Sequence, residues 1–153
     1  MTVIHQTTKF DAPIERVFEL ITDYKRYPEW NVNYVEVLAV EGLPQAPGTR
    51  IHAVMKFLDR KLDGWAEVKD VEAPTFIRLS GTSKEGGHLT VSYRLRPIDA
   101  ATEVEMELDY ELPTAPFAKI LDRLFLERAV ERDVRHSLEN FKAFIEARMP
   151  VLA

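Results

Sequence analysis

The stretch EVEMELDYEL, residues Glu103–Leu112, alternates acidic and apolar side chains without an error. This period of two is typical of a strand with one buried face and one solvated face. The stretch His88–Arg96 alternates in a similar way, so the two segments are predicted to form an antiparallel hairpin. In that hairpin Arg94 and Arg96 share the solvated face with the acidic row, and the charges pair across the strands. We therefore interpret the acidic row as a sheet surface and not as a metal site.

The segments before this hairpin predict more strands and two short helices. Alternating apolar residues between turn-forming residues predict strands over residues 3–10, 32–40, 50–57, 65–71 and 75–83. The turn before the fourth strand is expected over residues 59–64, and Pro97 is expected to end the sixth strand. Pro13 precedes an apolar stripe that predicts a helix over residues 14–21. Residues 24–27 predict one more helical turn.

The segment after Pro116 contains about thirty residues without Gly or Pro and predicts one long helix that ends before Pro150. Its apolar residues form two groups on a helical wheel, displaced by roughly a hundred degrees. The first group consists of Phe117, Ile120, Leu121 and Leu124, and the second of Val134, Leu138, Phe141 and Ile145. Either the helix bends near Leu126–Val130, or its first part packs over something other than the sheet that receives the second part.

This order of elements predicts an α+β fold. A seven-stranded antiparallel sheet twists and tends to curl, and the long helix must then lie in the curl. Two short helices between the first and second strands would close one end of the core. The chain has 153 residues and shows no linker and no internal repeat, so we expect a single domain over residues 1–153.

The composition excludes several classes of function. The chain has no cysteine, so it has no disulfide, no thiolate metal site and no cysteine nucleophile. Its net charge of −5 lacks the basic excess on which binding to nucleic acid depends. No apolar run is long enough to cross a membrane, and the N-terminus lacks the pattern of a signal peptide. We expect a cytoplasmic protein without a nucleic-acid partner or a transmembrane segment.

Motifs for metal and cofactor binding are also missing from the sequence. The four histidines, His5, His52, His88 and His136, lack the spacing of a metal site, although His5 and His52 could share a face of the sheet. The pair Gly86-Gly87 lies in a hairpin with no helix after it, so it is not a phosphate-binding loop. No serine lies in a nucleophile-elbow motif. We expect no metal and no cofactor.

Four segments carry a resemblance to a known family. They are Asp11-Ala-Pro-Ile-Glu-Arg-Val-Phe18, Asp23-Tyr-Lys-Arg-Tyr-Pro-Glu-Trp30, Pro47-Gly-Thr49 and Ser137-Leu-Glu-Asn-Phe-Lys142. In this order they resemble the START-like, helix-grip (Bet v 1-like) superfamily, specifically its polyketide cyclase/dehydrase and lipid-transport (SRPBCC) branch. The resemblance covers essentially the whole chain, and the corner Tyr27–Trp30 is also similar to that of coenzyme Q-binding relatives.

The resemblance implies a deep, mainly apolar cavity between a curved sheet and the long helix that it grips. The superfamily includes carriers, hormone receptors and cyclases, so the resemblance implies no single reaction. We expect a carrier, sensor or sequestering protein for a hydrophobic small molecule or lipid, such as a polyketide or a quinone-like molecule, acting as a monomer or homodimer. One alternative is a polyketide aromatase/cyclase-like enzyme. Another is a module that docks on a protein or a membrane through an apolar strip from Phe117 to Leu126.

Candidate ligand-binding residues come from the apolar strand faces, from the corner after the short helices and from the start of the long helix. They are Trp30, Met55, Phe57, Leu79, Val91, Tyr93, Met106, Leu108, Tyr110, Phe117, Leu121 and Leu124. Tyr93 and Tyr110 are the polar members of the hairpin's buried face, and a ligand oxygen can be the partner that each hydroxyl needs. Each of these residues can instead be part of the hydrophobic core without contacting a ligand, with any polar atom bonded to protein or water. Phe117, Leu121 and Leu124 face a ligand only if the displaced helical stripe does.

Catalysis would need ionisable groups inside the cavity. The helical wheel places Glu127 and Glu131 near the inward direction. Tyr93, Tyr110 and Glu131 are therefore the candidates for orienting a polyketide and assisting proton transfer. The two glutamates can equally belong to a solvated helix face, because they lie four residues apart in an alternating charge pattern.

Overall fold

A seven-stranded antiparallel sheet with the order β1-β7-β6-β5-β4-β3-β2 forms the frame of the molecule. The computed structural model describes residues 2–118 and 122–149. Its elements are β1 (Thr2–Phe10), α1 (Ile14–Ile21), η1 (Tyr24–Glu29), β2 (Tyr34–Glu41), β3 (Arg50–Phe57), β4 (Arg60–Glu72), β5 (Phe76–Ser83), β6 (Gly86–Ile98), β7 (Ala101–Glu111), η2 (Ala115–Phe117) and α2 (Arg123–Glu146). Within these residues, no helix is long and apolar enough to cross a membrane.

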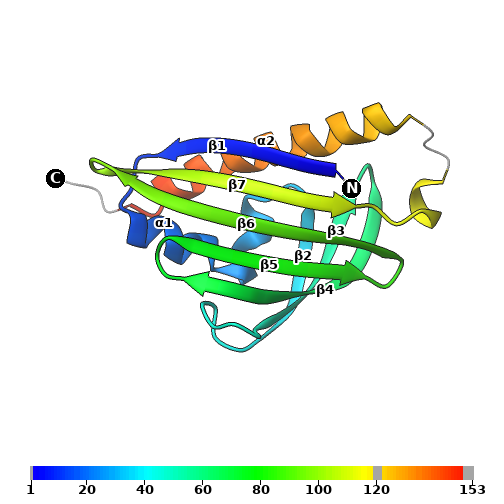
Figure 1. The fold of residues 1–153 in the computed structure, drawn as a ribbon, viewed down its shortest axis with the longest axis horizontal. Helices are drawn as coiled ribbons and strands as arrows, with labels where there is room; N and C mark the ends of the chain where they lie inside the picture. The colour runs from blue at the N-terminus through cyan, green and yellow to red at the C-terminus, as the bar shows by residue number, and fades with distance from the viewer. Residues whose placement is uncertain (1, 119–121, 150–153) are drawn as a thin grey trace.

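The sheet curves around one side of α2, and the short helix α1 closes one end of the curve (Figure 1). This arrangement confirms the expected α+β fold with a curled sheet and a long C-terminal helix. The β6–β7 hairpin has the expected register, because Arg94 pairs with Glu105 and Arg96 pairs with Glu103. The guanidinium of Arg96 lies 2.9 Å from the carboxylate of Glu103, as expected for charges that pair across the hairpin. Glu105, Glu107 and Glu111 are exposed, so the acidic row lies on the solvated face of the sheet.

Helix α2 buries one apolar stripe against the sheet. The buried apolar side chains of this stripe are Val130, Val134, Leu138, Phe141, Phe144 and Ile145. The ring of Phe141 is 1% exposed and lies 5.2 Å from the ring of Phe10 and 4.5 Å from that of Trp30. Phe141 therefore joins α2 to β1 and to the end of η1.

Several predicted limits are wrong. Strand β2 begins at Tyr34 and not at residue 32, β6 begins at Gly86 and not at residue 88, and η1 continues through Pro28 to Glu29.

Strand β4 begins at Arg60 and not at residue 65, because the turn is made by Leu58 and Asp59, which both have positive φ angles. Strand β6 continues through Pro97 to Ile98, and the turn follows at Asp99. Proline does not end this strand because it lies beside the hairpin turn, where few ladder hydrogen bonds remain to be made.

The predicted continuous helix after Pro116 is also wrong. The chain forms the short helix η2 and then starts α2 at Arg123, where the side chain of Asp122 accepts a hydrogen bond from the backbone N–H of Phe125 at 3.1 Å. Of the first apolar group, Phe117 therefore lies in η2 before the long helix, whereas Leu124 lies within α2 and is 54% exposed. Ile120 and Leu121 lie outside the described residues.

Replacing Phe141 with alanine is expected to lower the free energy of unfolding by about 3–5 kcal/mol, because the change leaves a cavity among aromatic rings. Urea denaturation measures this loss. The matched control is Phe125→Ala on the same helix, where the side chain is 55% exposed. The control should change stability by no more than about 0.5 kcal/mol. Equal losses in the two variants would show that α2 is not anchored through Phe141.

Candidate functional site

Two adjoining cavities lie on the concave side of the sheet. Cavity 1 is bounded by β3, β4, β5 and β6 and reaches the β5–β6 hairpin and Pro113. Cavity 2 is bounded by the end of η1, by strands β3, β6 and β7, and by Val134, Ser137 and Leu138 of α2. The residues that line both cavities are Tyr34, Met55, Phe57, Leu89 and Tyr110. These shared walls place the two cavities next to each other.

Small residues in register form the floor of cavity 1. Ala53 on β3 pairs with Gly64 on β4, and Ala66 on β4 pairs with Gly81 on β5. A Cβ atom added at Gly64 would collide with a backbone carbonyl of β5, so no larger residue fits there without a shift of the strand. Cavity 1 therefore exists because four neighbouring positions on the concave face carry one side-chain carbon or none.

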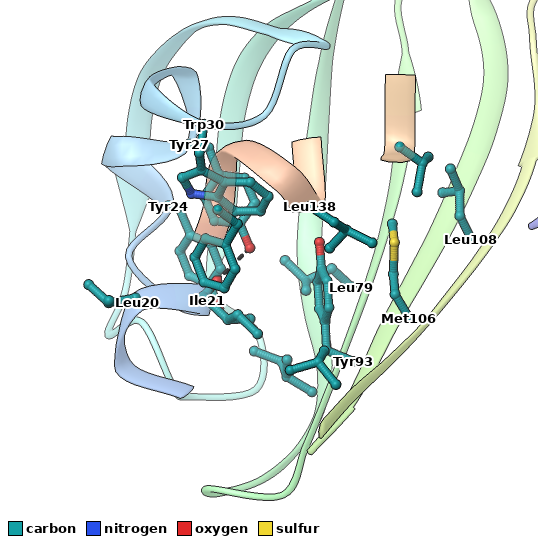
Figure 2. Packing of buried hydrophobic residues seen from close by; sticks show 14 of the residues in the cluster. Leu20, Ile21, Tyr24, Tyr27, Trp30, Leu79, Tyr93, Met106, Leu108 and Leu138 are labelled. Atoms are coloured by element: carbon teal, nitrogen blue, oxygen red, sulfur yellow. Dashed lines mark hydrogen bonds between the residues drawn. The ribbon is translucent and has the colours of Figure 1, made fainter. Parts of the chain in front are cut away.

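Aromatic rings form one wall of cavity 2. The ring of Tyr27 lies 4.9 Å from that of Trp30 and 5.1 Å from that of Tyr34, both in edge-to-face geometry. Figure 2 shows Tyr24, Tyr27 and Trp30 gathered on one side, with Leu138 and Tyr93 facing them. These rings give the cavity a rigid apolar wall with a few polar atoms.

Polar side chains of α2 tie the chain after η1 to the helix. Asn140 Nδ2 donates to the backbone carbonyl of Trp30 at 3.2 Å, Asn33 Nδ2 donates to Asp133 Oδ2 at 3.0 Å, and the backbone N–H of Val32 donates to Ser137 Oγ at 3.0 Å. Asn33 is 5% exposed, so its hydrogen bond is shielded from water. These bonds fix the position of Trp30 and of the cavity wall that follows it.

Burial raises the pKa of each tyrosine in the chain. The affected residues are Tyr24, Tyr27, Tyr34, Tyr93 and Tyr110. The pKa of Tyr34 rises to about 12, because the phenolate would be removed from water. At Tyr110 the negative charge of Glu127 adds to the effect of burial on the pKa. All five hydroxyls therefore carry their proton at neutral pH.

Within the described part of the chain, two buried polar groups on cavity-lining residues have no hydrogen-bond partner. They are the indole N–H of Trp30 and the hydroxyl of Tyr110, on side chains that are 2% and 7% exposed. The hydroxyl of Thr2 is close to Tyr110 but donates to Glu127 at 3.3 Å. Tyr24 and Tyr27 differ, because their hydroxyls donate to backbone carbonyls at 2.6 and 2.5 Å. Unpartnered buried donors are uncommon and mark places where a ligand can bind.

Most of the sequence-derived candidates line the cavities. The residues that do so are Trp30, Met55, Phe57, Val91, Tyr93, Met106, Leu108 and Tyr110. Leu79 and Phe117 are buried but line neither cavity, so the structure places them in the core. Leu124 is 54% exposed and does not roof the cavities, because α2 begins only one residue before it. Leu121 lies outside the described residues.

The inward orientation expected for Glu131 is wrong. Helix α2 turns Val130 and Val134 inward, and Glu131 is exposed. Glu127 is partly buried beside Thr2 but lines neither cavity. The acid–base hypothesis thus loses the geometry on which it was based for both glutamates.

The sequence reasoning missed the floor of cavity 1 and part of the wall of cavity 2. Tyr34 lines both cavities, and Asn33 and Ser137 line cavity 2. The alternation along β3 and β4 contains a signal for the floor, since Gly and Ala occupy inward positions where large apolar residues are usual. Recognising that signal requires the register between strands, which one sequence does not provide.

No group of three or more His, Asp or Glu residues in the described ranges is placed to hold a metal ion. His5 and His52 point away from the cavities. His5 lies 2.8 Å from the carboxylate of Glu105, and His52 lies 2.6 Å from that of Asp63. Each histidine is thus paired with one carboxylate on the outer side of the sheet.

Solved structures with the same fold cover nearly all of this chain. An aromatase/cyclase from Streptomyces sp. R1128 is 18% identical with a TM-score of 0.77, over 98% of this chain and 96% of that one. The protein TTHA0849 from Thermus thermophilus is 22% identical with a TM-score of 0.73, over 97% of this chain and 100% of that one. A START superfamily protein from Mycobacterium smegmatis is 12% identical with a TM-score of 0.72, over 96% and 99% of the two chains.

At these identities the structural matches show the fold and not the function. A comparison with curated protein sequences found no match. The comparison with protein families found one match over residues 1–146, which includes every described strand, both cavities and the whole of α2. This protein therefore belongs to the family described as polyketide cyclase / dehydrase and lipid transport.

Proposed function

We propose that this protein binds a hydrophobic small molecule or lipid in cavities 1 and 2, as a carrier, sensor or sequestering protein of the cytoplasm. The observation that carries the proposal is the pair of adjoining, mainly apolar cavities between the sheet and α2. Small-molecule sites have this character, with apolar walls and a few polar groups that fix orientation. Family membership supports the same conclusion.

The cavities can widen around a ligand. Their volumes are about 70 and 50 Å³, which is room for a few water molecules each, since one water needs about 10–15 Å³. A lipid-sized ligand must therefore displace side chains. Met55 and Met106 lie on the walls, and methionine adapts its shape more easily than other large apolar residues.

The ionisation of the lining residues favours binding over acid–base catalysis. Tyr93 and Tyr110 have raised pKa values and stay protonated at neutral pH, so they can donate hydrogen bonds but are poor bases. Among the described residues, the acidic or basic side chains that line a cavity are His88 and Glu111, at the hairpin end of cavity 1. The cyclase alternative thus has no separate observation in its favour among these residues.

The alternative of a docking module has weaker support than the cavities. Leu124 and Phe125 are exposed at the start of α2, whereas Phe117 is 5% exposed and belongs to the core. The described part of the expected strip is therefore not a continuous apolar surface. We retain ligand binding as the proposed function.

The five tyrosines are expected to ionise at higher pH in the folded protein than in the unfolded chain, because burial raises their pKa values. At about pH 10, where unfolded tyrosine titrates, near-ultraviolet absorbance should therefore show much less tyrosinate in the folded protein. Because the folded chain holds protons that the unfolded chain releases, stability should fall as the pH rises above 10 toward the pKa of about 12 at Tyr34. The same titration in concentrated urea is the control. A folded protein that forms as much tyrosinate as the unfolded chain at about pH 10 would show that the tyrosines are not buried as described.

Ala66→Leu is expected to reduce ligand binding without unfolding the protein, because the larger side chain fills cavity 1. Native mass spectrometry of protein purified from its own host should find a bound apolar molecule on the unaltered chain and little on the variant. Ala143→Leu places the same change on an exposed position of α2 and should keep the ligand. Urea denaturation checks that both variants fold.

Two negative measurements together would contradict the proposal that the cavities bind a ligand. If the unaltered protein repeatedly carries no apolar molecule, and no member of a panel of lipids, quinones and polyketides raises its melting temperature, the cavities are not a binding site. Extraction with organic solvent identifies the chemical class of whatever does copurify.

A further inference from the structure

The side chain of Tyr110 lines both cavities, so its hydroxyl is a candidate contact for a ligand in either one. Tyr110 lines cavity 1 and cavity 2 and is 7% exposed, and its hydroxyl donates a hydrogen bond to no residue in the described ranges. Its neighbour on β1 is Thr2, whose own hydroxyl donates to Glu127. A buried hydroxyl that donates to nothing costs free energy, and a ligand oxygen at this point would remove that cost.

The indole N–H of Trp30, which lines cavity 2, is a second donor that has no partner among residues 2–118 and 122–149. An indole N–H can only donate, so its ligand partner must be an acceptor. Tyr34 and Tyr93 add two more protonated hydroxyls to the walls of the same cavity.

Asn31, Asn33 and Ser137 also line cavity 2, but their side chains already take part in hydrogen bonds within the protein. The buried polar groups that remain free for a ligand among the described residues, the indole of Trp30 and the hydroxyl of Tyr110, can both donate.

Charge at the site disfavours an anionic ligand. No Lys or Arg of the described ranges lines either cavity. The negative charges of Glu127 and Glu131 each raise the pKa of Tyr110 further, and the positive charge of Arg123 opposes them with a smaller effect than either, so negative charge predominates near this hydroxyl. A carboxylate or phosphate placed there would lose its hydration and face like charges without gaining a Lys or Arg partner among the described residues of the cavity walls.

The charged residues at the site also do not favour a cationic ligand. A buried ammonium group needs a carboxylate partner, and no acidic residue in the described ranges lines cavity 2. Glu111 lines cavity 1, but it lies 3.8 Å from His88 at the hairpin end. An uncharged ligand therefore has the smallest unfavourable desolvation free energy when it binds between these walls.

We infer that the ligand is an uncharged apolar molecule that carries an acceptor oxygen, such as a ketone, quinone or ester, and that Tyr110 donates a hydrogen bond to that oxygen. This inference rests on the proposed function, because it names the chemical class that the same cavities select. It separates neutral oxygenated molecules from free fatty acids, which have the same apolar chain but an anionic head.

The test compares two pairs of probes by equilibrium dialysis. The first pair is 2-methyl-1,4-naphthoquinone and 2-methylnaphthalene, which share a ring skeleton but differ in the two carbonyl oxygens. The second pair is methyl decanoate and decanoate, which differ in charge. The chain has no cysteine, so the quinone cannot be captured by a thiol.

Tyr110→Phe removes the donor and keeps the ring. It should weaken binding of the quinone about tenfold, the effect of losing one buried hydrogen bond, and leave 2-methylnaphthalene unchanged. Tyr24→Phe is the matched control, because the Tyr24 hydroxyl donates to the carbonyl of Pro44 and lines neither cavity. The control should change neither affinity. The unaltered protein should bind methyl decanoate at least about tenfold more tightly than decanoate at neutral pH.

Different results overturn different claims. If the probes bind but Tyr110→Phe leaves quinone affinity unchanged, or decanoate binds as tightly as its ester, the inference is wrong while the binding function stands. If none of the four probes binds to the unaltered protein, the proposed function fails and the inference fails with it. The ester comparison uses only the unaltered chain, so it decides the charge preference even if Tyr110→Phe does not fold.

Discussion

Burial of one face of α2 in the curl of the sheet is the constraint on which the rest of this structure depends. The C-terminal half of the helix packs tightly, with Phe141 between the rings of Phe10 and Trp30. The helix starts only at Arg123, and no described residue of α2 lines cavity 1. In that region the strands carry glycine and alanine on their concave face. The packing of α2 thus closes the core around Phe141, leaves cavity 2 against Val134, Ser137 and Leu138, and leaves cavity 1 where no described residue of the helix reaches.

Most of the fold could be predicted from the sequence because its signals are local. The alternation in Glu103–Leu112 fixed which face of β7 is buried, and the same pattern gave β6 and the register of their hairpin. The limits of β4 and the start of α2 were missed. They depend on positive φ angles at Leu58 and Asp59 and on a helix cap by Asp122, which a propensity pattern does not reveal.

The candidate site was only partly predictable, because it depends on relations between distant residues. Periodicity identified Tyr93, Met106 and Tyr110 as inward-facing. It could not show that Ala66 would pair with Gly81 on the neighbouring strand. Nor could it show that α2 would bury Val130 and Val134 and leave Glu131 exposed. Whether a hydroxyl has a partner is likewise a property of the packed molecule.

The most direct test of the account is methyl NMR of the methionines during titration with 2-methyl-1,4-naphthoquinone. The sequence contains four methionines, of which Met55 and Met106 line the cavities and Met149 lines neither. Binding between the sheet and α2 predicts that the methyl signals of Met55 and Met106 shift together until saturation, while that of Met149 stays in place. Saturable binding that leaves Met55 and Met106 unshifted would place the ligand elsewhere and contradict the central claim.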